Sequence, residues 1–325
     1  MEKKPEPSEF TSGWVDNLLE EYSISLKALN RSQKTIDWYL DILRKYFGHL
    51  SRNNMLKPIE QLGPRELQAY LLHLRERERW PNNKYIKEKG KLSPFSIQGT
   101  ARAIKAFWSW LLNSGIIEEN PLAKFPLPKV PKNLIQTITV ANMKTLFNVV
   151  DKSTLEGERL YCILLTFIDT GTRIGEAVVI KIPEVDFQQR IITVTGKGQK
   201  QREVPFSSKT RKDLIKFKDG SRNKLCNVES DYLFPDKYGN HVTIGSVQQA
   251  VRRLAKKVGV ECHPHLFRHT FGTTFIANGG SPAMLKEIMG HESFQTTEKY
   301  IHPKTQDLKM QHQLHSPVKE LFKQD

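Results

Sequence analysis

The stretch HPHLFRHTFGT, residues 263–273, holds an unusual density of chemically active side chains. Pro264 suits the first turn of a helix, and the apolar residues that follow it recur at helical spacing. His265 and Arg268 lie three positions apart on the predicted helix, so both point to one side of its opening turn. His265 and Arg268 are therefore candidate functional residues.

The same stretch offers a metal site as an alternative interpretation. Zinc is held by cysteine and histidine side chains, and four of these fall within eight residues: Cys262, His263, His265 and His269. Their spacing is too crowded for a common four-ligand zinc pattern, and no second cysteine and histidine cluster follows. The spacing therefore disfavours zinc, which stays the alternative, and we expect no cofactor.

A second motif, TGTRIGEA at residues 170–177, combines an arginine with a carboxylate. Gly171 can take the positive φ that ends one helix, which places Arg173 in the first turn of the next. Glu176 follows three residues later on the same face, where it can hold the guanidinium in one orientation. A guanidinium fixed in this way grips phosphate with two parallel hydrogen bonds. The alternative is an ordinary ion pair on a helix surface.

A third motif, GKGQKQREVP at residues 196–205, joins two predicted strands at 191–194 and 203–205. Glycines on both sides of Lys197 leave its ammonium free to reach a ligand, although basic turns are also common without a function. The segment lacks the spacing of a nucleotide-binding P-loop, and no good match occurs elsewhere. The sequence therefore argues against the use of ATP.

A fourth motif, LKEIMGHESFQTTEKYIH, covers residues 285–302. An apolar helix is predicted to end at Gly290, which leaves His291 in a loop. Tyr300 is then predicted on a short helix capped by Thr296 or Thr297. Taken alone, such a tyrosine is more often a packed aromatic residue than a nucleophile.

The length of 325 residues is enough for two domains, each with its own core. Helical spacing of apolar residues predicts helices at 35–47, 64–74 and from residue 96 to about 113, which indicates a small N-terminal bundle. Four prolines between residues 121 and 133 forbid a continuous helix there and mark the domain boundary. The remainder combines helices with the strand pair described above.

The charge balance points to a polyanion as partner. The chain has 50 Lys and Arg against 35 Asp and Glu, which gives a net charge of +15. Nucleic acid is the first candidate, and a well-solvated basic surface is the alternative. The basic segment at 80–91 is read as a surface loop that could face DNA. No apolar run is long enough for a membrane span, and the three cysteines fit a reducing cytoplasm.

Together the four motifs, in this order and spacing, resemble the tyrosine recombinase family, also called the phage integrase family. The resemblance implies a mainly α fold with a small antiparallel β-sheet, in which an N-terminal helical core-binding domain precedes a mixed α+β catalytic domain. We expect the DNA-binding domain at 1–120, the linker at 121–133, the catalytic domain at 134–303 and a docking tail at 304–325.

The resemblance also implies a mechanism. Tyr300 would attack the scissile phosphate and form a 3′-phosphotyrosyl link without ATP or metal. Arg173 and Arg268 would lower the tyrosine pKa and balance charge on the phosphate. The remaining roles would be proton acceptor for His265, acid for Lys197, phosphate contact for His291 and orientation of this side of the pocket for Glu176.

By the same resemblance the partners would be double-stranded DNA with specific recombination sites, a homo-tetramer on synapsed DNA and, as a candidate, an accessory directionality factor. We expect integration or excision of a mobile element. The alternatives are a chromosome or plasmid dimer resolvase, a type IB topoisomerase, an inactive DNA-binding protein and a zinc-dependent nuclease.

Overall fold

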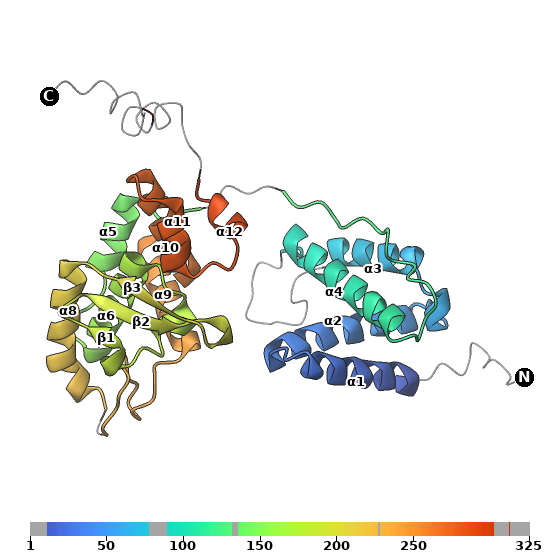
Figure 1. Cartoon of the computed structure of the whole chain (residues 1–325), viewed down its shortest axis with the longest axis horizontal. Coiled ribbons are helices and arrows are strands. Elements are labelled where there is room, and N and C mark those ends of the chain that lie inside the picture. Colours follow the sequence, from blue (N-terminus) through green and yellow to red (C-terminus); the bar gives the residue numbers. More distant parts are fainter. Residues whose placement is uncertain (1–11, 78–89, 132–135, 227, 302–311, 313–325) are drawn as a thin grey trace, which may run out of the picture. The chain divides into compact units, whose positions relative to one another are not determined.

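The chain forms two compact units, Met1–Asn133 and Leu134–Asp325, which are described separately (Figure 1). The computed structural model describes residues 12–77, 90–131, 136–226, 228–301 and 312. The basic segment at 80–91 lies outside these ranges except for its last two residues, and the tail lies outside them except for residue 312. Within the described ranges, no helix is both long enough and apolar enough to cross a bilayer.

The N-terminal unit is a bundle of the helices α1 (Ser12–Ala28), α2 (Gln33–Arg52), α3 (Pro64–Glu76) and α4 (Pro94–Asn113), with a 3-10 turn η2 (Ile59–Gln61) before α3. Serine caps start two of the helices: Ser32 accepts from the backbone of Thr35, and Ser93 from that of Ser96. The core is rich in aromatic rings that pack edge to face, including Tyr46 against Trp108. Helices α2, α3 and α4 match the three that the apolar spacing predicts, and α1 adds a fourth that was not predicted.

The proline-rich segment after α4 is held against that helix. Leu122 is fully buried in the N-terminal core. The ammonium of Lys105 on α4 donates to the carbonyls of Ala123 at 3.1 Å and Phe125 at 2.6 Å, and the amide of Gln98 donates to Pro128 at 2.8 Å. Prolines leave backbone carbonyls without neighbouring N–H partners, so side chains of α4 take that place.

The C-terminal unit contains a three-stranded antiparallel sheet of β1 (Val185–Asp186), β2 (Ile191–Thr195) and β3 (Gln201–Pro205), in that order. Val194 on β2 pairs with Arg202 on β3. The two strands are joined through a single 3-10 turn, η4 (Lys197–Gln199), in which Gly198 has a φ of 75°. The sheet therefore presents Lys197 at a tight hairpin tip, as the sequence predicts.

Helices surround this sheet: α5 (Val140–Asn148), α6 (Leu155–Thr170), α7 (Ile174–Ala177), α8 (Ser208–Asp219), α9 (Ile244–Val258), α10 (Pro264–Ala277), α11 (Pro282–Met289) and α12 (Gln295–Glu298). Short 3-10 turns η3 (Ile182–Glu184) and η5 (Ser221–Lys224) precede β1 and follow α8. Helix α6 packs against both α8 and α10. Figure 1 shows α10, α11 and α12 grouped at one end of this unit. The expected mainly α fold with a small antiparallel sheet is confirmed.

Candidate active site

Arg173 is positioned by the turn between α6 and α7. Gly171 ends α6 with a φ of 62°, and Arg173 is the residue that caps α7. Its backbone N–H donates to Glu176 Oε2 at 2.9 Å, and its guanidinium donates to Glu176 Oε1 at 2.8 Å. The predicted arginine and carboxylate contact thus forms, and 39% of the Arg173 side chain stays exposed for a ligand.

Glu176 also contacts a second arginine, Arg202, which is not among the predicted site residues. Arg202 on β3 donates to both carboxylate oxygens, at 3.1 and 2.7 Å. Burial alone would raise the pKa of Glu176, but hydrogen bonds from Arg202 and Arg173 stabilise the charged form and bring its pKa to about 2. Glu176 is therefore an ionised, buried carboxylate between two guanidiniums.

Arg268 lies on the opening turn of α10 and is almost fully buried, with 5% of the residue exposed. Its guanidinium donates to the carbonyls of Gly171 at 2.6 Å and Met289 at 2.7 Å. Burial and the nearby Arg173 charge lower its pKa to about 10, so Arg268 remains protonated at neutral pH. The turn that carries Arg173 and the end of α11 are thereby tied to α10.

The C-terminal end of α11 accepts hydrogen bonds from all three arginines. Arg202 Nε donates to the Ile288 carbonyl at 2.8 Å, Arg268 donates to Met289, and Arg173 donates to Gly290 at 3.2 Å. The last carbonyls of a helix have no partners within the helix and carry the negative end of its dipole. This helix end therefore gathers the three cationic groups.

His291 follows directly and is buried. Its Nδ1 lies 2.8 Å from the hydroxyl of Thr297, inside α12. The prediction that Thr296 or Thr297 caps this helix is wrong: α12 starts after Phe294 with no side-chain cap, since the Thr297 hydroxyl faces His291 instead. Burial and the Arg268 charge lower the pKa of His291 to about 4, so its ring is neutral at pH 7.

Tyr300 lies beyond the end of α12 and is 3% exposed. Its hydroxyl is 2.9 Å from Nδ1 of His269, and its ring is stacked parallel to the His291 ring with 6.2 Å between centroids. Burial raises the pKa of Tyr300, whereas Arg268 and Arg173 act in the opposite direction. The arginines thus favour the phenolate as expected, but burial outweighs them in this arrangement.

The histidine at the Tyr300 hydroxyl is His269, whereas the sequence reading assigned the proton to His265. The two histidines lie four residues apart and so share a face of α10, but His265 is exposed, whereas His269 is partly buried. Burial, together with the charges of Lys299 and the neighbouring site residues, lowers the pKa of His269 to about 4. A neutral imidazole can accept a proton, so His269 is a further candidate that is not among the predicted site residues.

Lys197 stands at the N-terminal end of η4, directly after Gly196. Its side chain lies outside the described part of the structure, so only its place on the hairpin is known. A Cβ atom on Gly196 would lie 3.4 Å from Glu176 and 3.5 Å from Arg202. The hairpin tip thus begins against the same ion pair that holds Arg173.

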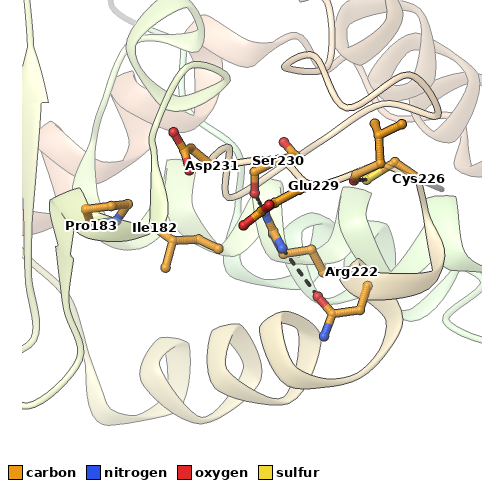
Figure 2. A pocket seen from close by; sticks show the side chains of 9 residues that line it. Ile182, Pro183, Arg222, Cys226, Glu229, Ser230 and Asp231 are labelled. Atoms are coloured by element: carbon orange, nitrogen blue, oxygen red, sulfur yellow. Dashed lines mark hydrogen bonds between the residues drawn. The ribbon is translucent and has the colours of Figure 1, made fainter.

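A cavity of about 420 Å³ elsewhere in the unit contains none of the predicted site residues. Figure 2 shows Arg222 of η5 beside it, together with Cys226, Glu229 and Asp231. The buried Arg222 donates to the carbonyls of Ser230 and Tyr232. Arg222 therefore fixes a loop. Among the described residues, moreover, there is no group of three or more His, Cys, Asp or Glu that could hold a metal.

Comparison with known proteins adds a family match. The model of the phage integrase family matches residues 136–307, which include every candidate residue named above. Two curated relatives are both tyrosine recombinases XerC. The protein from Oceanobacillus iheyensis is 28% identical over 89% of this chain and 91% of its own length. The protein from Bacillus pumilus is 32% identical over 71% of this chain and 77% of its own length.

Solved structures share the fold. The Tn1549 transposon integrase in complex with a circular intermediate DNA superposes with a TM-score of 0.72, at 18% identity, over 91% of this chain and 98% of that one. The XerH site-specific recombinase bound to difH substrate gives a TM-score of 0.65, at 19% identity, over 90% of this chain and 82% of that one.

Proposed function

Since the chain belongs to the phage integrase family and is a tyrosine recombinase, we propose that it cuts and rejoins double-stranded DNA at specific sites, with Tyr300 as its nucleophile. One observation carries the assignment of Tyr300. Its hydroxyl has a neutral imidazole nitrogen 2.9 Å away and lies in the field of Arg268 and Arg173. This is the environment that a tyrosine needs in order to lose a proton to an adjacent base.

The reaction is a transesterification. The Tyr300 oxygen forms a bond to the scissile phosphorus as the bond to the 5′-oxygen breaks, which leaves a 3′-phosphotyrosyl link and a 5′-hydroxyl. Attack by a 5′-hydroxyl of a partner strand reverses these steps, so the phosphoester count is unchanged and no nucleotide is hydrolysed. Arg173 and Arg268 balance the charge on the non-bridging oxygens. Lys197 supplies the proton to the departing oxygen.

The three histidines of the site have different proposed roles. His269 takes the Tyr300 proton, because its Nδ1 already contacts the hydroxyl and its low pKa keeps it unprotonated. His265 is exposed on the first turn of α10, where it can contact the phosphate. His291 is held by Thr297 and contributes a phosphate contact from the end of α11. Glu176 orients Arg173.

Tyr300 must move before it reacts, because a DNA phosphate cannot reach a hydroxyl on a residue that is 3% exposed. The ring packs against α10 so closely that a Cβ on Gly272 would lie 3.0 Å from it. We propose that DNA binding shifts the segment after α11 so that the hydroxyl meets the phosphate while it stays within reach of His269. The resting arrangement keeps the nucleophile shielded from solvent.

The DNA partner is supported by the net charge of +15 and by the Tn1549 transposon integrase, whose solved structure is a complex with DNA. Lysine and arginine contacts to phosphates make such binding fall steeply with salt, by about 10³-fold or more between 50 and 200 mM. A homo-tetramer on synapsed DNA, a tail at 304–325 that docks between protomers and an accessory directionality factor remain part of this proposal.

The curated relatives favour one biological role over another. Both relatives described above are tyrosine recombinases XerC, which supports resolution of chromosome or plasmid dimers. Integration or excision of a mobile element is the second candidate. It rests on the basic segment at 80–91, most of which lies outside the described residues. A strain that lacks the gene should accumulate dimers if the first role holds, and should fail to excise an element circle if the second holds.

The chemistry is tested with a nicked suicide duplex that carries a candidate site from the repeats flanking the gene. We expect a covalent protein–DNA complex that survives denaturant and is removed by protease. Tyr300→Phe should bind the duplex with near wild-type affinity and form no such complex. A covalent complex formed by that variant would overturn the assignment of the nucleophile, and metal-dependent hydrolysis in its place would revive the nuclease alternative.

A further inference from the structure

We propose that Arg202 is a positioning residue for strand cleavage, an inference that rests on the function proposed above. Arg202 lies on β3 with 13% of its side chain exposed. All three nitrogens of its guanidinium are engaged, two by Glu176 and one by the Ile288 carbonyl. Arg202 therefore acts through the residues that it holds rather than on the phosphate itself.

The first effect of Arg202 is on Arg173. Each oxygen of Glu176 accepts one hydrogen bond from Arg173 and one from Arg202. A buried carboxylate that loses half of its donors is costly and reorients toward the donors that remain. Glu176 would then turn toward Arg173 alone and draw its guanidinium away from the phosphate.

The second effect is on the end of α11. The Arg202 guanidinium lies against Gly290, where an added Cβ would come within 2.9 Å of it. Gly290 has a φ of 61°, a conformation in which glycine is favoured in any case. Arg202 thus fills the space beneath this turn and fixes the point from which His291 starts.

The third effect is on the hairpin tip. Arg202 pairs in register with Val194, and Gly196 lies against the contact between Arg202 and Glu176. Lys197 follows Gly196 directly. A single guanidinium consequently joins the strand pair that carries the proposed acid to the helix ends that carry the phosphate ligands.

The test is Arg202→Lys, which keeps the charge but cannot make the two parallel bonds to Glu176. We expect single-turnover cleavage of the nicked duplex at saturating DNA to fall about 10²-fold, the loss expected from a small misplacement of reacting groups. The apparent affinity for DNA should change less than about threefold. The matched control is Arg190→Lys. Arg190 is exposed, directly precedes β2 and donates from its side chain to Ser208, so this variant should cleave at the wild-type rate.

A double-mutant cycle separates positioning from a general loss of structure. If Arg202 acts in part through Arg173, the combined loss in the double variant R173A/R202K should be clearly smaller than the product of the two single losses. A duplex with a neutral methylphosphonate at the scissile position gives a second readout. It lacks the charge that Arg173 balances, so the defect of R202K should shrink to less than about fivefold.

Three outcomes would contradict the inference. The first is cleavage by R202K at the wild-type rate, and the second is a double-variant loss equal to the product of the two single losses. The third is an R202K defect of the same size on the methylphosphonate duplex as on the ordinary duplex. If R202K unfolds below the assay temperature, E176Q tests the same link from the other partner and should show the same cycle with R173A. The wild-type reaction runs in parallel. Its failure to form a covalent complex would refute the proposed function, whereas a normal wild-type complex confines any failure to the role of Arg202.

Discussion

Tyr46 in the N-terminal unit and Tyr300 in the C-terminal unit are both buried, but their hydroxyls meet opposite surroundings. Tyr46 is 0% exposed, and its hydroxyl has no hydrogen-bond partner among the described residues. Its neighbours are the rings of Phe47, Tyr70 and Trp108. Burial raises the pKa of Tyr46, with the Glu66 charge adding to the effect.

Tyr300 is almost as buried, yet its hydroxyl lies 2.9 Å from an imidazole nitrogen and in the field of two cationic guanidiniums. Burial by itself does not distinguish a nucleophile from a packing residue, because both tyrosines would be classed as core. The distinction lies in a proton acceptor and in the sign of the nearby charge, which is positive at Tyr300 and negative at Tyr46. Substitutions at the two tyrosines and at their neighbours test this difference.

The largest effect is expected for Tyr300→Phe. The variant keeps the ring and removes the attacking oxygen, so formation of the covalent complex should fall by about 10⁴-fold or more. Tyr46→Phe removes a buried hydroxyl that has no hydrogen-bond partner among the described residues, and this variant should cleave at the wild-type rate. Both are measured on the nicked duplex under single-turnover conditions. Equal losses in the two variants would erase the distinction between the tyrosines.

Arg268→Lys should lower the cleavage rate by about 10²- to 10³-fold, because a lysine cannot bridge the Gly171 and Met289 carbonyls while also facing the phosphate. The matched control is Arg222→Lys, since Arg222 is equally buried and also donates to carbonyls, but lies beside the cavity in Figure 2. That control should reduce thermal stability without a comparable loss of rate per folded molecule. A selective loss of rate in the control would contradict the assignment.

His269→Gln should slow cleavage by about 10²-fold, the usual contribution of a general base. The pH dependence gives a sharper test. The pKa of His269 is lowered to about 4, so the ring takes up a proton only as pH falls toward 4, and the wild-type rate should decline there. His291 titrates in the same range and remains in both proteins, so the comparison with H269Q isolates the His269 contribution. An identical acid limb in H269Q would exclude His269 as the proton acceptor.

The same two histidines make folding sensitive to acid. Their pKa values lie below the ordinary value of about 6.5, so between pH 6.5 and 4 the unfolded chain binds protons that the folded chain does not. Stability should therefore fall as pH falls through this window. Denaturant unfolding at pH 7 and pH 5 measures the change, which should be smaller in the double variant H269Q/H291Q.

The smallest effect is expected for the stability of Tyr46→Phe. Removing a hydroxyl that is buried without a partner relieves its desolvation cost, so the variant should be unchanged or more stable by up to about 1 kcal/mol. Urea unfolding followed by circular dichroism measures the difference. A loss of more than about 1 kcal/mol would show that the hydroxyl has a stabilising partner.

Local patterns predicted most of the fold because the relevant signals are local. Gly171 and Gly290 end helices with positive φ at the places that the sequence indicates, and Pro64 opens α3. Helix α8 was not predicted, because its many lysines hide the apolar pattern in the sequence. Its buried residues are Thr210, Leu214 and Phe217. Their spacing of four and three is helical, so the signal was present in the sequence.

The predicted contact between Arg173 and Glu176 forms, whereas the catalytic roles of the site residues stay predictions. Arg173 and Arg268 both donate to carbonyls at the end of α11, and His291 follows that end directly. Arg202 was not predicted as a site residue, although the strand pattern locates it. It lies two residues before the fully buried Val204 on β3, and residues two apart on a strand share a face, so the arginine lies on the inner face.

His269 was overlooked for a different reason. It lies 31 residues from Tyr300 in the sequence, and only the packing of the segment after α11 onto α10 brings them together. No local pattern carries that information. Long-range pairing of this kind depends on the folded core, whereas the proton-acceptor role of His265 was what the family resemblance implied.

The arginine cluster at the end of α11 has a consequence for the protein before it meets DNA. Three guanidiniums that would otherwise repel one another are each already engaged by a carbonyl of this helix end. The cationic pocket is therefore complete without a bound anion, and its electrostatic cost is met during folding. An incoming phosphate therefore meets a preformed pocket. Discrimination between DNA sites then depends on contacts made outside this pocket.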